Sequence, residues 1–177
     1  MKHYSNVDLT EVVDYLEKHH VVLKEKMVKV SQLLEQMIVR YEDKYGRIFG
    51  ALRDFFAEIK PEMERHFDKE ERILFPYIRQ VDGFVTTGGK PDFNYGSIKN
   101  PIGLIEYEHD RIENVLLINM RAIVDNYTLP PDAREDLKRF YDSVQDTEKE
   151  LREHIYIENN VLFPQAIETE MRLMHSR

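Results

Sequence analysis

Apolar residues recur every three or four positions in the first part of the chain, which is the spacing of one face of an α-helix. The residues on this face are Val13, Leu16, Leu23, Met27, Val30, Leu34, Met37 and Tyr41. One step of seven residues interrupts the series, and His20 fills it. The neighbouring His19 is turned by about 100° around the helix axis, so it should lie at the edge of the face. The pattern predicts a helix over about residues 7–45 with His20 directed inward.

The same periodicity predicts three further helices, over about residues 47–81, 101–127 and 131–170. Glycine and proline gather between the second and third of them, so we expect a long loop over residues 82–100. The expected inward positions are Leu52, Phe55, Ile59, Met63, His66, Glu70, Ile73 and Tyr77, then Ile102, Ile105, His109, Ile112 and Leu116, then Leu151, His154, Glu158 and Val161.

Four amphipathic helices with three connections predict an all-α fold, an antiparallel up-down-up-down four-helix bundle. A chain of 177 residues is long enough for one domain with a substantial core, so we expect a single domain over residues 1–177.

One motif occurs twice. The pattern H-x-x-x-E-x-x-x-L-F-P begins at His66 and again at His154, 88 residues later. His20 and His109, one upstream of each copy, lie 89 residues apart. The repetition predicts two related halves and a pseudo-twofold arrangement of the bundle.

Histidine and glutamate four residues apart project side by side from one helix face. A glutamate on an apolar face is costly to bury unless something neutralises it, and a metal ion does so. The sequence therefore predicts a metal site in the core. Imidazole and carboxylate suit iron, manganese or zinc. The expected metal-binding residues are His20, His66, Glu70, His109, His154 and Glu158; further candidates, as ligands or as groups around them, are Glu113, Glu108 and His19.

A rival set of ligands has E-x-x-H spacing, as in ferritin-like di-iron bundles. Glu17 precedes His20 and Glu106 precedes His109 by three residues. This alternative leaves His66 and His154 buried without a role, and neither Glu17 nor Glu106 follows its apolar face closely.

Composition excludes several classes of protein. The chain contains no cysteine, which excludes disulfides and thiolate metal sites. Its formal net charge of −8 argues against nucleic acid as a partner. No apolar run reaches the roughly 20 residues of a membrane span, and no signal peptide is evident, so we expect a cytoplasmic protein without membrane contact. A monomer is favoured over a dimer, because each helix uses its one apolar face for the core.

These motifs, with HHVVLK from residue 19 and EHD from residue 108, resemble the haemerythrin-like (HHE cation-binding) domains. The repair of iron centres (RIC) di-iron proteins are the most similar members. The resemblance implies two iron ions joined by an oxo or hydroxo bridge, with the four histidines as ligands and Glu70 and Glu158 as bridging carboxylates. Members of that family carry an additional N-terminal domain with cysteine. This sequence shows no counterpart, so we expect its role to be absent or supplied by another protein.

The resemblance implies a role in the nitrosative and oxidative stress response, namely supplying iron to repair damaged iron-sulfur clusters of a client protein. An alternative is a di-iron enzyme that reduces nitric oxide or peroxide, and whether the chain is an enzyme stays open. A second alternative is an oxygen-binding or redox-sensing protein, which His109 with Glu113 disfavours because oxygen carriers have H-x-x-x-H on this helix. The remaining alternative is a helical interaction module without metal.

Overall fold

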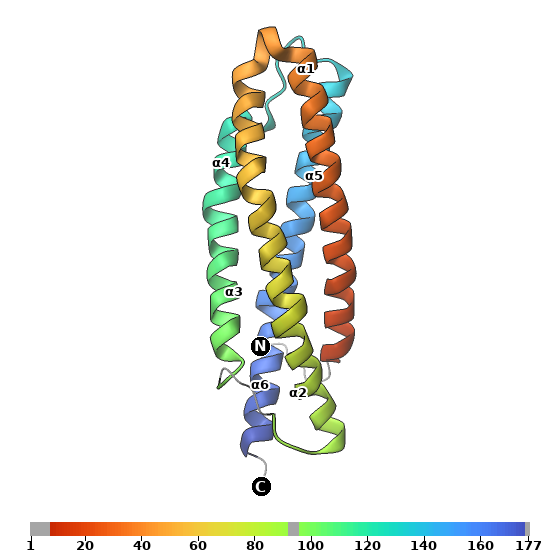
Figure 1. Cartoon of the computed structure of the whole chain (residues 1–177), viewed down its shortest axis with the longest axis vertical. Helices are drawn as coiled ribbons and strands as arrows, with labels where there is room; N and C mark the ends of the chain where they lie inside the picture. Colours follow the sequence, from red (N-terminus) through yellow and green to blue (C-terminus); the bar gives the residue numbers. More distant parts are fainter. Residues whose placement is uncertain (1–7, 92–95, 176–177) are drawn as a thin grey trace. The chain divides into compact units, whose positions relative to one another are not determined.

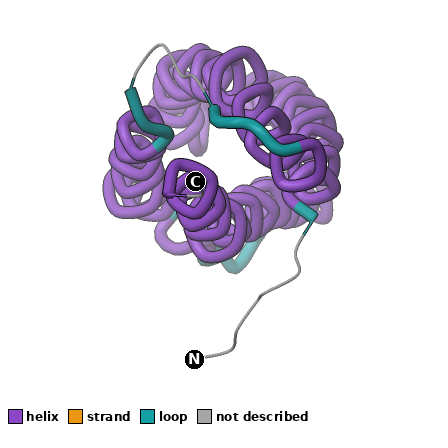
Figure 2. The backbone as a smooth tube through the Cα atoms, turned by 90° about the horizontal axis from the view of Figure 1, so that it is seen from below, coloured by secondary structure: helices purple, strands orange, loops and turns teal. Residues whose placement is uncertain are grey.

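The computed structural model describes residues 8–91 and 96–175, which form helices joined by turns and loops, with no strand among them (Figure 2). The predicted all-α class is confirmed. The described residues form six α-helices, labelled in Figure 1: α1 (Leu9–Lys69), α2 (Phe75–Thr87), α3 (Lys99–Arg111), α4 (Leu117–Ile123), α5 (Glu135–Ile157) and α6 (Phe163–His175). The expected start of the first helix at residue 7 lies outside the described residues.

Helix α1 begins at a capping residue and contains a kink. The Asp8 side chain accepts a hydrogen bond from the Glu11 backbone N–H at 3.0 Å, which stabilises the first turn. Further along, Tyr41 and Tyr45 have non-helical backbone angles, with φ of −120° and −127°. The kink falls next to the predicted boundary between residues 45 and 47, although the helix continues through it to Lys69.

Three wide π turns interrupt the α-helices, at Glu70–Leu74, Ile112–Leu116 and Glu158–Leu162. In the first, the Phe75 N–H donates to the Glu70 carbonyl five residues back. The repeated L-F-P sequence explains two of these turns. Proline clashes with the carbonyl four residues earlier in an α-helix, and a wider turn moves that carbonyl away from Pro76 and Pro164. No proline follows the turn at Ile112–Leu116 closely enough to explain it in this way.

Each proline-linked turn shifts the buried face by one residue. Ile73 was expected on the inward face, but it is 38% exposed, whereas Leu74 is 1% exposed. In the second copy, Val161 is only partly buried and Leu162 is fully buried. The prediction for Ile73 was wrong because it assumed an uninterrupted 3.6-residue period through the turn.

The expected loop over residues 82–100 is shorter than predicted. Helix α2 continues to Thr87 and ends at Gly88, whose φ of 74° lies in the left-handed region that favours glycine. Residues 92–95 of the expected loop lie outside the described residues. Helix α5 begins at Glu135 rather than near residue 131, since Pro130 and Pro131 lie in a turn closed by the Ala133 N–H and the Pro130 carbonyl.

Contacts divide the chain into two compact units. The first unit takes residues 1–20, 66–109 and 153–177, and the second takes residues 21–65 and 110–152. The core of the first unit comprises Leu9, Val13, Leu16, Leu74, Phe75, Tyr77, Ile78, Val81, Ile98, Ile102, Ile105, Leu162, Phe163 and Ala166. Buried apolar residues of the second unit include Leu23, Val30, Leu34, Phe49, Leu52, Phe140 and Val144.

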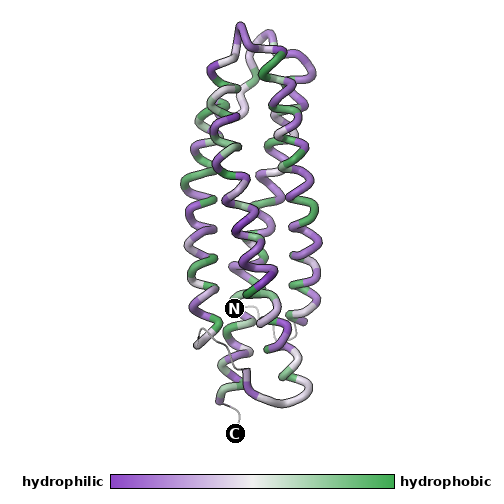
Figure 3. Tube along the Cα trace, viewed as in Figure 1, coloured by the Kyte–Doolittle hydropathy of each residue, from purple (hydrophilic) through white to green (hydrophobic). Residues whose placement is uncertain are grey.

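Figure 3 shows apolar and polar positions alternating along the helices, as expected for helices with one buried face. Among the described residues, no helix combines the length and the apolar character that crossing a bilayer requires.

Candidate metal centre

The six predicted metal-binding residues converge in the core of the first unit. His66 is 2% exposed, and the other five side chains are fully buried. Their donor atoms form two groups, each within 4.8 Å: His20, Glu70, His154 and Glu158, and His66, Glu70, His109 and Glu158. Both glutamates belong to both groups. We call the His20–His154 pair the first half-site and the His66–His109 pair the second half-site.

Within each half-site, the two imidazoles face each other through their Nε2 atoms. The Nε2 atoms of His20 and His154 are 3.1 Å apart, as are those of His66 and His109. Glu70 reaches both pairs: its Oε2 lies 3.2 Å from His20 Nε2, and its Oε1 lies 3.2 Å from His66 Nε2.

Glu158 also lies between the half-sites. Its Oε2 is 3.2 Å from His109 Nε2 and 3.3 Å from His154 Nε2. Two ligand atoms at about 2.1 Å from one ion are about 3.0 Å apart in octahedral and about 3.4 Å apart in tetrahedral coordination. The observed separations therefore match ligands that share an ion.

The proton positions in the second half-site favour a cation between the imidazoles. Nδ1 of His66 lies 2.9 Å from Glu108 Oε2, and Nδ1 of His109 lies 2.8 Å from Asn159 Oδ1. Both oxygens are acceptors, so we assign the proton of each neutral ring to Nδ1. Two Nε2 lone pairs then face each other at 3.1 Å, which is repulsive unless a positive charge lies between them.

The two buried carboxylates lack hydrogen-bond partners. Neither oxygen of Glu70 or Glu158 accepts a hydrogen bond of acceptable geometry from any described residue. Burial raises the pKa of Glu70, but the charge of His66 and the neighbouring His109 and His20 outweigh burial and hold that pKa below its ordinary value. Burial and the charge of Glu70 raise the pKa of Glu158. The neighbouring His154 and His109 lower it by more, so the pKa of Glu158 also lies below its ordinary value. Both groups are thus buried anions, which fits a bound metal.

The same two carboxylates, Glu70 and Glu158, also shift the pKa of His109. Burial alone lowers its pKa, but Glu158 and Glu70 raise it to about 10. The centre therefore favours positive charge at this position, and a metal ion provides that charge without a proton.

Three polar residues orient the imidazoles from outside. Glu71 Oε1 lies 2.8 Å from His20 Nδ1, while Glu108 and Asn159 hold His66 and His109. Glu108 also pairs with Lys69, and the hydrogen bond with His66 lowers the pKa of Glu108 to about 2 despite partial burial. Such partners fix ring orientation and are typical of metal-binding histidines.

Glu108 was predicted as a candidate, whereas Glu71 and Asn159 were missed. Their position in the repeated motif could have identified them, because each directly follows one of the repeated glutamates, Glu70 and Glu158. The two missed residues therefore occupy the same position in the two copies of the motif.

His19 lies at the edge of the centre, as its helical position predicted. It is 8% exposed, and its ring centroid is 5.6 Å from that of His154. Glu113 is not in either group of converging atoms and instead pairs with Arg152 at 3.3 Å. The structure therefore does not bring Glu113 to the centre.

The rival E-x-x-H set is not assembled either. Glu17 accepts two hydrogen bonds of 2.8 Å from Arg79, and Glu106 is exposed. Neither belongs to a converging group in the described part of the chain.

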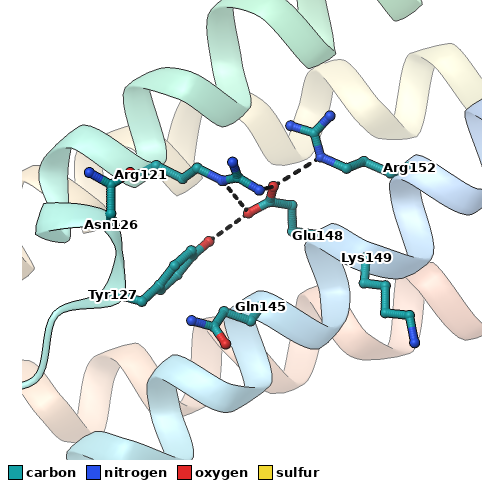
Figure 4. A pocket seen from close by; sticks show the side chains of 7 residues that line it. All are labelled: Arg121, Asn126, Tyr127, Gln145, Glu148, Lys149 and Arg152. Atoms are coloured by element: carbon teal, nitrogen blue, oxygen red, sulfur yellow. Dashed lines mark hydrogen bonds and ion pairs between the residues drawn. The ribbon is translucent and has the colours of Figure 1, made fainter.

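The second unit contains another buried carboxylate, Glu148, in a very different setting (Figure 4). It accepts hydrogen bonds from Arg121 at 3.2 and 2.5 Å, from Arg152 at 3.0 Å and from Tyr127 at 2.9 Å. Burial raises the pKa of Glu148, but these donors outweigh burial and lower it below its ordinary value. The cluster borders a cavity of about 490 Å³ lined by Arg121, Asn126, Tyr127, Gln145, Glu148, Lys149 and Arg152.

A strained turn positions Tyr127 in this cluster. Asp125, Asn126 and Tyr127 have φ of 47°, 51° and 62°, so three successive residues with side chains adopt the left-handed region. Such backbone persists only where the surroundings hold it. The contact of Tyr127 with Glu148 is part of what holds it here.

The chain belongs to a known family of cation-binding domains. The family model described as "Hemerythrin HHE cation binding domain" matches residues 11–166, which include all six residues of the centre. Membership of a cation-binding family agrees with the two converging groups of histidine and glutamate.

Particular relatives are iron-sulfur cluster repair proteins. The chain is 28% identical over 174 residues to the "Iron-sulfur cluster repair protein YtfE" of Salmonella schwarzengrund (strain CVM19633). It is equally similar to the proteins of that name from Salmonella paratyphi B and Salmonella newport. Each alignment covers 96% of this chain and 71% of the relative.

Proposed function

We propose that this chain is a di-iron protein that supplies iron for the repair of iron-sulfur clusters damaged by nitrosative or oxidative stress. The observation that carries the proposal is the pair of buried carboxylates, Glu70 and Glu158, shared between two pairs of facing imidazoles. The relatives, which are named iron-sulfur cluster repair proteins, support the same function.

In this proposal His20, His66, His109 and His154 would each hold an ion through Nε2, and the carboxylates of Glu70 and Glu158 would be shared between the two ions. Each ion would then have two nitrogen and two carboxylate ligands, fewer than the six that octahedral iron takes. The remaining positions would hold an oxo or hydroxo bridge and exchangeable ligands such as diatomic molecules or peroxide. Iron agrees with the mixed imidazole and carboxylate set, as do manganese and zinc.

We further propose that the helices form a four-helix bundle of the haemerythrin type and that residues 1–177 act as one cytoplasmic domain, as a monomer. Four stretches of the chain, one before and one within each copy of the repeat, contribute to the centre. This agrees with a bundle whose two halves are related by the repeat.

The direct test is transfer of iron to a client. The protein is loaded anaerobically with ferrous iron and mixed with an apo iron-sulfur protein, sulfide and thiol, and cluster absorbance is followed. We expect restoration by the loaded protein and loss of restoration in Glu158→Ala. Glu148→Gln serves as the control, because it alters a buried glutamate outside the centre and should restore clusters like the wild type.

Unchanged restoration by Glu158→Ala would refute the proposed donor role. A second assay separates donation from catalysis: consumption of nitric oxide beyond one equivalent per centre, with a reductant present, would favour the enzymatic alternative instead.

A further inference from the structure

The two half-sites differ in how their histidines are held. In the second half-site, Nδ1 of both rings has an acceptor, Glu108 for His66 and Asn159 for His109. In the first half-site, His20 has Glu71, but Nδ1 of His154 is buried and has no hydrogen-bond partner among the described residues.

One residue in the repeat accounts for this difference. Glu108 directly precedes His109, and the equivalent position 89 residues earlier, directly before His20, is His19. Glu108 holds the histidine of the facing motif, His66. His19 lies correspondingly close to the other motif histidine, His154, with ring centroids 5.6 Å apart. The first half therefore has an imidazole where the second half has a carboxylate.

Metal binding makes this difference matter. A neutral histidine that binds a metal through Nε2 carries its proton on Nδ1. For His66 that N–H is donated to Glu108, whose charge also makes the ring a stronger ligand. For His154 the N–H would be buried without an acceptor, which disfavours the metal-binding tautomer. Loss of such an outer partner typically weakens metal affinity by roughly 10- to 100-fold.

From this we infer that the His20–His154 half-site releases its metal first, and that His19 in place of a glutamate causes this difference in metal release. The inference rests on the proposed function and assigns the donated ion to the His20–His154 half-site. The other half-site, held by Glu108 and Asn159, keeps its ion longer.

The experiment measures metal release to a chromogenic ferrous chelator from the iron-loaded full chain, without any client protein. We expect two phases of one equivalent each, with rates that differ by about 10-fold or more. His154→Ala should abolish the fast phase and retain the slow equivalent, whereas His66→Ala should retain only the fast one. Release of both equivalents at one rate, or the opposite assignment, would overturn the inference.

A reciprocal exchange tests the role of position 19 directly. His19→Glu supplies His154 with an acceptor and should slow the fast phase about 10-fold, so that the two rates converge. Glu108→His should speed the slow phase by a similar factor. Repeating both with zinc and a zinc indicator gives a readout independent of iron oxidation. A fast phase that His19→Glu leaves unchanged would contradict the assignment to His19.

The outcomes also separate this inference from the proposed function. Biphasic metal release without cluster restoration would reject the donor role alone. Cluster restoration with a single rate of metal release would reject only the proposed difference between the two half-sites.

Discussion

Glu70 and Glu158 in the first unit and Glu148 in the second unit are all buried glutamates, yet their surroundings differ completely. Glu148 accepts four hydrogen bonds from two arginines and a tyrosine. The oxygens of Glu70 and Glu158 accept no hydrogen bond from the described part of the chain, although imidazole nitrogens lie 3.2 to 3.3 Å away. Burial of a carboxylate is thus common to both regions, and only its partners distinguish them.

The comparison shows how a binding site differs from a structural ion cluster. Glu148 is satisfied by the chain itself, so it stabilises the fold without any other component. Glu70 and Glu158 instead face the Nε2 atoms of the four histidines, so a bound cation would compensate their buried charge. Substitutions at the two kinds of glutamate should therefore have opposite effects on metal binding and on metal-free stability.

Metal should stabilise the protein strongly, and only through the first unit. At metal concentrations about 1,000-fold above the dissociation constant, one bound ion adds about 4 kcal/mol to the free energy of unfolding. Glu158→Gln should remove most of this gain, whereas Glu148→Gln should keep it. Urea unfolding of loaded and chelator-treated protein measures the gain. An equal gain in both variants would mean that the glutamates of the centre do not bind the metal.

Glu148→Gln should act in the opposite way, on stability without metal binding. The amide loses the charge-assisted hydrogen bonds from Arg121 and Arg152, at a cost of about 1–3 kcal/mol. Both arginine side chains are partly exposed, so water can hydrogen-bond to them in place of Glu148. The loss of unfolding free energy therefore stays below that of a fully buried ion pair. Urea unfolding with metal analysis of the same samples checks both halves of this prediction. A stable variant that loses metal would reverse the assigned roles.

Acid should remove the contribution of Glu148. Its pKa is lowered in the folded protein from an ordinary value of 4.5, because hydrogen bonds from Arg121, Arg152 and Tyr127 outweigh its burial. A depressed carboxyl pKa stabilises the fold above the unfolded-state pKa, and that stability is lost as pH falls through the folded-state pKa. The difference in unfolding free energy between wild type and Glu148→Gln should therefore be constant from pH 7 to about 5 and shrink below about 4.5. A difference that grows on acidification would contradict this sign.

The smallest expected effect concerns the left-handed turn beside Glu148. Asn126 has a φ of 51°, which asparagine tolerates better than alanine. Asn126→Ala should therefore lower the free energy of unfolding by about 1 kcal/mol, and Asn126→Gly should not. Thermal unfolding of the two variants makes the comparison. Equal stability of the two would show that the turn is not under strain.

The burial of the six candidate residues could be predicted from the sequence, because these residues follow the helical period. His20, His66 and Glu70 each fall on an apolar face, so their burial could be read from spacing alone. The duplicated motif then supplied His154 and Glu158. The structure brings all of them, with His109, into the two converging groups.

Prediction failed where local geometry departs from that period or where tertiary partners decide the role. The wide turns before Pro76 and Pro164 bury Leu74 and Leu162, and the simple period selected Ile73 and Val161 instead. Glu113 follows His109 by four residues, as Glu70 follows His66, but it pairs with Arg152. A periodic pattern cannot reveal either difference. Arg152, which pairs with Glu113, is remote from it in sequence, and the wide turns change which residues face inward.

The most direct test of the metal centre is the metal content of the protein after anaerobic loading with ferrous iron and removal of excess iron. We expect about two irons per chain in the wild type and in Glu148→Gln, with absorption from a bridged pair after oxidation, and a clear loss of iron in Glu158→Gln. A wild-type protein that retains no iron, zinc or manganese after such loading would refute the metal centre.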